Sequence, residues 1–175
     1  MLRLVAGLVH PSAGEIYVND ISLKSIRMNH YRALLGQSIT EESPFEGTIL
    51  ENITLGDTSV SKQDVHWAME KTGLLSFVKR QPKGVNTIIY PEGIQMPYSV
   101  SKKLILARSI VRKPALLILN DPLDQLDEEE ENRILEFLFS EENSWSILVA
   151  SKDPKWEKYC SRIIQLEKGR IKNNT

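Results

Sequence analysis

The sequence predicts an α/β fold in which a mainly parallel sheet is flanked by helices. Two continuous apolar segments, at residues 115–119 and 146–150, are separated by a helical stretch at 128–139. Strands that are buried on both faces show this continuous apolar pattern, and an intervening helix makes them run parallel. With 41% hydrophobic and 26% charged residues, the 175-residue chain has the composition of one globular domain that can bury a core.

Helices and short strands are expected to alternate in the first half of the chain. Apolar residues at helical spacing predict a helix over residues 1–9, and Pro11 follows its expected end. The Asn19-Asp20 pair indicates a turn after a strand at 15–18. The other elements expected here are a helix at 28–34, a strand at 35–39, a short helix within 47–57, helices at 62–72 and 74–80, and an extended segment at 86–91.

The second half has a clearer alternation of helix and strand. Ligands of parallel sheets bind beyond the carboxyl ends of the strands, so we expect a site near Asn120-Asp121 and Ser151-Lys152. The expected elements are a helix at 101–111, a strand at 115–119, helices at 128–139 and 154–159 on either side of a strand at 146–150, and strands at 162–166 and 170–172 joined by a Lys168-Gly169 turn.

The segment that follows the apolar residues "LLIL" supports two interpretations. ATPases that transfer phosphoryl groups place two acidic residues there, one holding Mg²⁺ and the next orienting the attacking water. In this chain the first position is the uncharged Asn120, and the second is Asp121, whose side chain is one methylene shorter than glutamate. Alternatively, Asn120, Asp121 and Asp124 end a strand and cap a helix that begins near Asp127. Both interpretations remain open from this segment alone.

Composition excludes several classes of function. The net charge of -1 gives no general reason to expect nucleic acid as a partner. Neither a membrane-length apolar run nor a signal peptide is recognisable, and the single cysteine, Cys160, is expected to be a structural thiol. The acidic residues at 127–132 suit the first turn of a helix and are expected to form a solvated face.

Three collinear stretches resemble the nucleotide-binding domain of ATP-binding cassette (ABC) transporters of the exporter type. They are Leu2 to Val18, "FEGTILENITLGD" and "PEGIQMPYSVSKKLILARSIVRKPALLILNDPLDQLD". The resemblance implies a P-loop NTPase-like fold with a helical subdomain, here without the strand that carries the phosphate-binding loop. It divides the partial domain 1–175 into a segment after the Q-loop, the helical subdomain and the signature helix, roughly 45–112, and the Walker B strand, D-loop and switch region, 113–175.

The resemblance also assigns positions in the sequence to the family's functional motifs. Asn120 falls on the Walker B aspartate that binds the metal, and Asp121 falls on the catalytic carboxylate. Asp127 is the retained D-loop aspartate, Lys152 stands at the switch histidine, and Thr40 stands at the Q-loop glutamine. Lysine is a poor substitute for imidazole in positioning water, and asparagine lacks the charge that attracts Mg²⁺. These positions are therefore expected to be degenerate, apart from Asp121 and Asp127.

The family's signature sequence, Leu-Ser-Gly-Gly-Gln, falls on residues that cannot make its usual contacts. Serine and glycine donors at a helix N-terminus there approach the phosphate of an opposite subunit. Pro97 has no N–H, and Tyr98 adds bulk where a backbone should come close. Ser99 or Ser101 is expected to cap the helix instead. The matched positions are Met96, Pro97, Tyr98, Ser99 and Val100.

By resemblance the cofactors are ATP and Mg²⁺, and the partners are a second nucleotide-binding domain and a transmembrane domain, at the cytoplasmic face of a membrane. No G-x-x-x-x-G-K-[ST] motif occurs in these residues, so tight ATP binding by them alone is not expected. We expect a degenerate or N-terminally truncated domain with little hydrolysis. The alternatives are an active transporter ATPase from a truncated sequence and a scaffold or regulatory module without transport.

Overall fold

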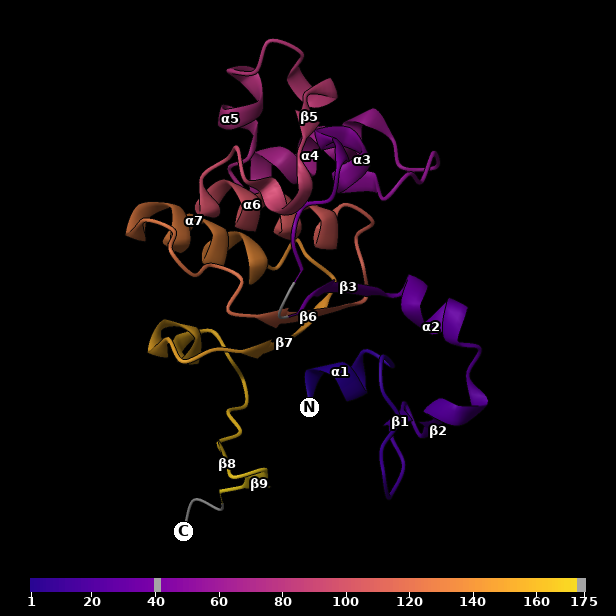
Figure 1. Cartoon of the computed structure of the whole chain (residues 1–175). Coiled ribbons are helices and arrows are strands. Elements are labelled where there is room, and N and C mark those ends of the chain that lie inside the picture. Colours follow the sequence, from indigo (N-terminus) through magenta and orange to yellow (C-terminus); the bar gives the residue numbers. More distant parts are fainter. Residues whose placement is uncertain (40–41, 173–175) are drawn as a thin grey trace.

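A three-stranded parallel sheet lies at the centre of the molecule, with helices on both of its faces (Figure 1). The computed structural model describes residues 1–39 and 42–172. The strand order is β3-β6-β7, and Leu117 in the central strand is opposite Gly36 on one side and Ile147 on the other. The predicted α/β class and the parallel pairing of the two apolar segments are confirmed.

The remaining elements alternate largely as expected from the sequence. The helices are α1 (Leu2–Val5), α2 (Met28–Ala33), α3 (Ile49–Thr54), α4 (Lys62–Lys71), α5 (Leu75–Lys79), α6 (Tyr98–Ile110) and α7 (Glu128–Leu138), with 3₁₀ segments at Leu23–Ser25, Gly84–Asn86, Pro91–Gly93 and Pro154–Lys158. The strands are β1 (Tyr17–Val18), β2 (Ile21–Ser22), β3 (Leu35–Ser38), β4 (Gly47–Thr48), β5 (Ile88–Ile89), β6 (Leu116–Asn120), β7 (Ser146–Ala150), β8 (Leu166–Glu167) and β9 (Arg170–Ile171).

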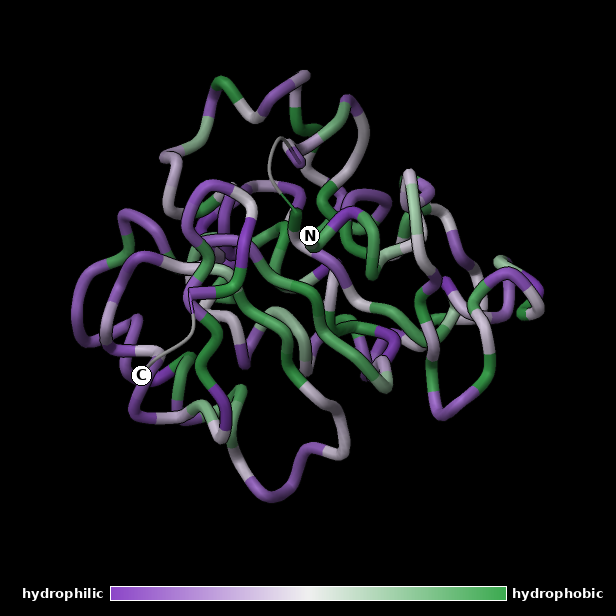
Figure 2. The backbone as a smooth tube through the Cα atoms, turned by 90° about the horizontal axis from the view of Figure 1, so that it is seen from below, coloured by the Kyte–Doolittle hydropathy of each residue, from purple (hydrophilic) through white to green (hydrophobic). Residues whose placement is uncertain are grey.

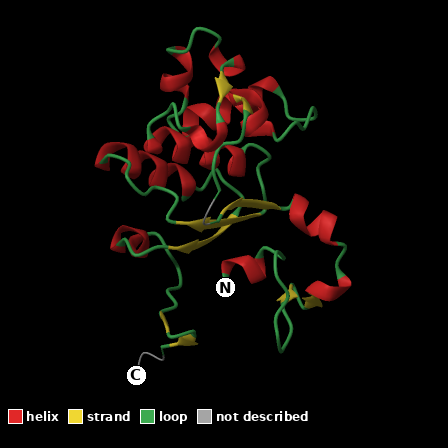
Figure 3. Cartoon of the chain, in the orientation of Figure 1, coloured by secondary structure: helices red, strands yellow, loops and turns green. Residues whose placement is uncertain are grey.

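The helices form a thick layer on one face of the sheet and a thin one on the other (Figure 3). On the thick side, α3, α4, α6 and α7 enclose the larger core, which contains the fully buried Leu104, Leu117 and Ile134. Each such side chain contributes about 1.5–3 kcal/mol on burial. On the other face, α1 packs Leu2 and Ala6 against the sheet. Seen from that side, the backbone through the middle of the molecule is hydrophobic and most outer loops are hydrophilic (Figure 2).

Asn52 joins the helical layer into one unit. Its side chain is fully buried, and its amide nitrogen donates to the carbonyl oxygens of Phe45 and Thr48 at 2.9 and 3.1 Å. Its side-chain oxygen accepts from the Phe45 N–H and from Arg108 of α6, each at 3.0 Å. A buried polar group whose hydrogen bonds are all made stabilises one arrangement of its neighbours. Asn52 therefore fixes the segment before α3 against the long helix α6.

Two predicted elements at the ends of the chain are wrong in extent. The helix expected over residues 1–9 ends at Val5, because Gly7 adopts a left-handed φ of +65° beneath the side chain of Met28. The strand expected at 162–166 is reduced to the two residues of β8, which pair only with β9. Residues 162–165 have no neighbouring strand in the described part of the chain, and an extended segment without a ladder is not a strand.

The edge of the sheet at β7 is open. Ser146 donates to the Ala115 carbonyl at 2.9 Å, and the Ala150 carbonyl accepts from Asp121 at 3.0 Å, so both residues face β6. Because backbone direction alternates along a strand, the N–H and C=O groups of Ile147 and Val149 point away from β6. Within residues 1–39 and 42–172, no strand pairs with that side of β7. In the same residues, no helix is long and apolar enough to cross a membrane.

Candidate functional site

The carboxyl ends of the three parallel strands open into one large hollow, which we call the central hollow. It has a volume of about 670 Å³ and is bounded by Ile39 after β3, Asn120 at the end of β6 and Ala150 at the end of β7. The other walls come from α1, the loop that follows it and Leu166. A ligand of a parallel sheet is expected at this edge. Of the positions at which the sequence places a site, Asn120-Asp121 and Ser151-Lys152, the central hollow is lined by Asn120.

Asn120 faces two hollows at once. Besides the central hollow it lines a cleft of about 420 Å³, the helix-side hollow, between the segment after β3 and the start of α6. The uncharged amide can donate and accept hydrogen bonds, but it brings no negative charge. Within residues 1–39 and 42–172, no three histidine, cysteine or carboxylate side chains lie close enough together to hold a metal ion. Asn120 can therefore offer a cation only a neutral amide oxygen.

Asp121 lines a different hollow from those that Asn120 lines. Its backbone is left-handed, with φ +40°, its N–H donates to Ala150 at 3.0 Å, and its carbonyl accepts from Lys102 at 3.3 Å. Its side chain lines a third hollow of about 410 Å³, the loop hollow, beside Lys152 and Glu131. The two positions that the sequence makes adjacent are thus on different sides of the strand end.

The loop hollow brings together two of the predicted site residues. Asp121 and Lys152 both line it, with Asp124 and Asp153 close by. Lys152 is exposed to solvent. Neither Asp121 nor Lys152 forms an ion pair within the described residues. The hollow therefore offers one free lysine ammonium group among several carboxylates, an arrangement that attracts cations more than phosphate.

The predicted capping of the signature helix is wrong. α6 begins at Tyr98 with Pro97 at its N-cap, so Ser99 and Ser101 lie inside the first turns and no side chain caps the helix. Tyr98 is 48% exposed, and the Lys102 ammonium lies 5.2 Å from the centre of its ring. Met96 and Val100 are buried beneath them. The start of α6 therefore presents an aromatic side chain, and Pro97 contributes no N–H there.

α7 begins near Asp127, as the sequence predicts, but the expected capping by Asn120, Asp121 or Asp124 is wrong, because Asp127 itself is the N-cap. Its carboxylate accepts from the Glu130 N–H at 2.9 Å, and this bond holds the pKa of Asp127 below its usual range. The same residue is the retained D-loop aspartate of the resemblance. Thr40, at the Q-loop position, lies outside the described residues.

The sequence analysis missed Glu42 and Lys102. Both line the helix-side hollow with Asn120, although the three residues are far apart in the chain. Burial raises the pKa of the Glu42 carboxyl above its ordinary value, and the Ile39 N–H and the charge of Arg108 oppose that shift. No local pattern marks these residues, because only the packing of α6 against β3 brings them together.

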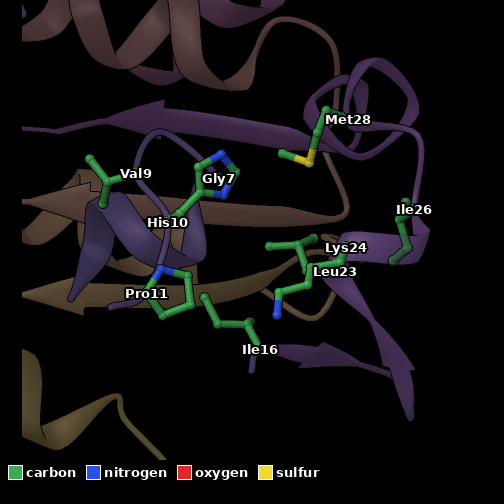
Figure 4. Close-up of a pocket in the computed structure, with 9 residues that line it drawn as sticks. All are labelled: Gly7, Val9, His10, Pro11, Ile16, Leu23, Lys24, Ile26 and Met28. Carbon is green, nitrogen blue, oxygen red and sulfur yellow. The ribbon is translucent and has the colours of Figure 1, made fainter. Parts of the chain in front are cut away.

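A smaller hollow of about 220 Å³ lies beside the central hollow and shares Val9, His10 and Pro11 with it (Figure 4). It lies between the loop after α1, the segment before β1 and the start of α2, and its lining is apolar except for His10 and Lys24. Lys24 forms an ion pair with Glu15 at 2.9 Å. The predicted site residues do not line this smaller hollow.

The fold and the polar residues at the strand ends define a class: an α/β domain of the P-loop NTPase type with a helical layer over one face. The chain belongs to the ABC transporter family, whose model matches residues 1–124. A bacterial Atm1-family ABC exporter with ATP bound has the same fold, with a TM-score of 0.90 at 22% identity, over 98% of this chain and 30% of that one.

Relatives in the family are substantially longer than these 175 residues. ABC transporter B family member 15 of Arabidopsis thaliana is 29% identical over 79% of this chain and 11% of that protein. The uncharacterized ABC transporter ATP-binding protein YfiB of Bacillus subtilis is 26% identical over 98% of this chain and 30% of that protein. The chain thus spans less than a third of the length of these curated relatives.

Proposed function

We propose that these residues form a nucleotide-binding domain of an exporter-type ABC transporter. The domain acts by packing against partner domains and hydrolyses little or no ATP itself. Its partners are a second such domain and a transmembrane domain, at the cytoplasmic face of the membrane. One observation carries the proposal: the strand β6 ends in the neutral Asn120, while the Asp121 carboxylate lines a different hollow. An ATP-hydrolysing site uses two charged carboxylates at these positions, facing one space. Here Asn120 is neutral, and Asn120 and Asp121 line different hollows.

The residues at the start of α6 are better suited to packing against a partner domain than to contacting a nucleotide phosphate. Pro97 has no N–H to donate, and the exposed ring of Tyr98 carries Lys102 against it. An exposed aromatic side chain with a neighbouring cation is well suited to contact another protein. We propose that this surface, at the signature position Met96 to Val100, packs against the partner domain.

ATP and Mg²⁺ are the family's cofactors, and the proposal for this chain is weak binding. The 175 residues contain no G-x-x-x-x-G-K-[ST] loop, and that loop supplies the backbone N–H groups and the lysine that hold phosphates. The four-residue α1 does not replace it. Thr40 and Lys152 stand at the Q-loop and switch positions without the side chains that those positions use in the family.

An active ATPase is the second candidate, because Asp121 and Lys152 share the loop hollow. In that case the carboxylate would orient a water and the lysine would contact the γ-phosphate as a point charge. The shorter stem of aspartate and the neutral Asn120 count against fast turnover, since each misplacement or lost charge costs about an order of magnitude in rate.

A chimaera tests the two candidates directly. With the upstream strands and phosphate loop of a relative joined before Met1, the protein is expected to hydrolyse ATP slowly, and Asn120→Asp is expected to raise kcat about tenfold by restoring the charge that attracts Mg²⁺. Asn132→Asp, the same change at an exposed position of α7, is the control and should leave kcat unchanged.

Two outcomes would contradict the proposal of low activity. One is a chimaera without substitutions that hydrolyses ATP as fast as the relative that donated the loop. The other is an Asn120→Asp variant with the parent rate. Asp121→Asn in the Asn120→Asp background then tests the role of the Asp121 carboxylate. An unchanged kcat would show that this carboxylate takes no part in the reaction.

A further inference from the structure

The loop at residues 121–127 has a conformation that its own hydrogen bonds do not explain. It joins β6 to α7, and two of its non-glycine residues, Asp121 and Gln125, have left-handed φ values of +40° and +63°. Within the loop, Asp124 and Leu126 donate to carbonyls three residues earlier, at 3.3 and 3.2 Å. Left-handed backbone in such residues costs free energy and persists only where the surroundings hold it.

Two consecutive lysines of α6 contact the two ends of this loop. Lys102 donates to the Asp121 carbonyl at 3.3 Å, where the loop begins. Lys103 forms an ion pair with Glu130 in the first turn of α7, where the loop ends. Lys103 is only 7% exposed, so its ammonium group depends on this carboxylate. A buried charge whose partner is removed is strongly destabilising.

A second ion pair continues the connection to the segment after β7. Glu131, also only 7% exposed, accepts from Lys155 at 2.5 Å, and this bond raises the pKa of Lys155 above its ordinary value. The acidic residues at 127–132 were expected to be a solvated face, and that prediction is wrong for Glu130 and Glu131. Their carboxylates connect α7 to α6 on one side and to the 3₁₀ segment Pro154–Lys158 on the other.

We infer that Lys102, Lys103, Glu130, Glu131 and Lys155 form an electrostatic brace that holds the loop 121–127 in a single conformation. The brace makes the start of α6, the loop and the segment after β7 one rigid surface. Lys103 is its central positioning residue, because it is the most buried cation of the five residues. It joins α6 to α7 through Glu130, which lies 27 residues further along the chain. The inference deepens the proposed function, since this surface is the one offered to the partner domain.

The test is amide hydrogen exchange on the full 175-residue chain with the brace altered. In Lys103→Met and in Glu130→Gln, the amides of residues 121–127 are expected to exchange at least about tenfold faster, as local opening becomes easier. The double variant is expected to exchange no faster than Lys103→Met alone, because the two residues act through one ion pair. Lys103→Arg, which keeps the charge, should retain most of the protection.

The controls separate bracing from general stability. Lys79→Met removes an exposed lysine of α5 and should leave the exchange of 121–127 unchanged. Amides of α3, which bonds to Arg108 in the second half of α6, report on the rest of the core and should keep their rates in every variant. Unchanged exchange of 121–127 in Lys103→Met, or equal acceleration in α3 and in the loop, would overturn the inference. Since no nucleotide or partner is added, this result is independent of whether the domain hydrolyses ATP.

Discussion

Replacing Gly36 by alanine is expected to lower the free energy of unfolding by about 3 kcal/mol, because a buried site without space must distort its surroundings. A Cβ atom at Gly36 would lie 2.0 Å from the carbonyl oxygen of Ser109 in α6, and 2.7 and 2.8 Å from Leu117 and Pro114. The carbonyl belongs to helix backbone, so the helix as a whole would have to move away from β3. Urea unfolding followed by circular dichroism measures the change.

Gly14→Ala is the control for this substitution. A Cβ there meets no atom within 4 Å, although the φ of +78° disfavours any side chain. Its cost should stay near about 1 kcal/mol, the backbone contribution alone. A loss at Gly36 no larger than the loss at Gly14 would mean that α6 does not approach β3 as closely as described. Both elements also contribute to the wall of the helix-side hollow, β3 through Ser38 and α6 through Lys102 and Ile105.

The 175-residue chain is expected to self-associate through the open edge of β7. The outward N–H and C=O groups of Ile147 and Val149 form a template for another strand, and unprotected edges of this kind drive association. The nearby Ile163, Ile164 and Leu166 add exposed apolar surface. Light scattering coupled to size-exclusion chromatography should show species larger than one chain.

Val149→Pro is expected to shift the chain towards the monomer. Proline removes an N–H that points away from β6, so the ladder to β6 is kept while the edge is blocked. Leu148→Pro is the matched control: its N–H faces β6, and the variant should unfold. If the unsubstituted chain is a stable monomer at the same concentration, the open edge is not an association surface.

The parts of the fold that the sequence predicts correctly rest on local patterns. β6 and β7 follow from continuous apolar runs, and α7 starts near Asp127 as expected, although its N-cap is Asp127 itself. The turn at Asn19-Asp20 is also confirmed, with both residues in left-handed backbone between β1 and β2. In each case the physical cause lies within a few residues of the element.

The parts that the sequence does not predict depend on distant residues. The first helix stops early because Met28 packs on Gly7, and residues 162–165 are not a strand because no strand lies beside them. Glu131 is buried because Lys155 reaches it from another segment. Asp121 lines the loop hollow beside Lys152 and Glu131, which come from segments distant from it in the chain.

The most direct test of the central claim is a titration of the 175-residue chain with a fluorescent ATP analogue and Mg²⁺. We expect no saturable binding at micromolar analogue, because Asn120 is neutral and these residues contain no phosphate-binding loop. The competition control is unlabelled ATP, which should not change the signal. Saturable micromolar binding that unlabelled ATP displaces would contradict the account, since the residues would then hold nucleotide by themselves.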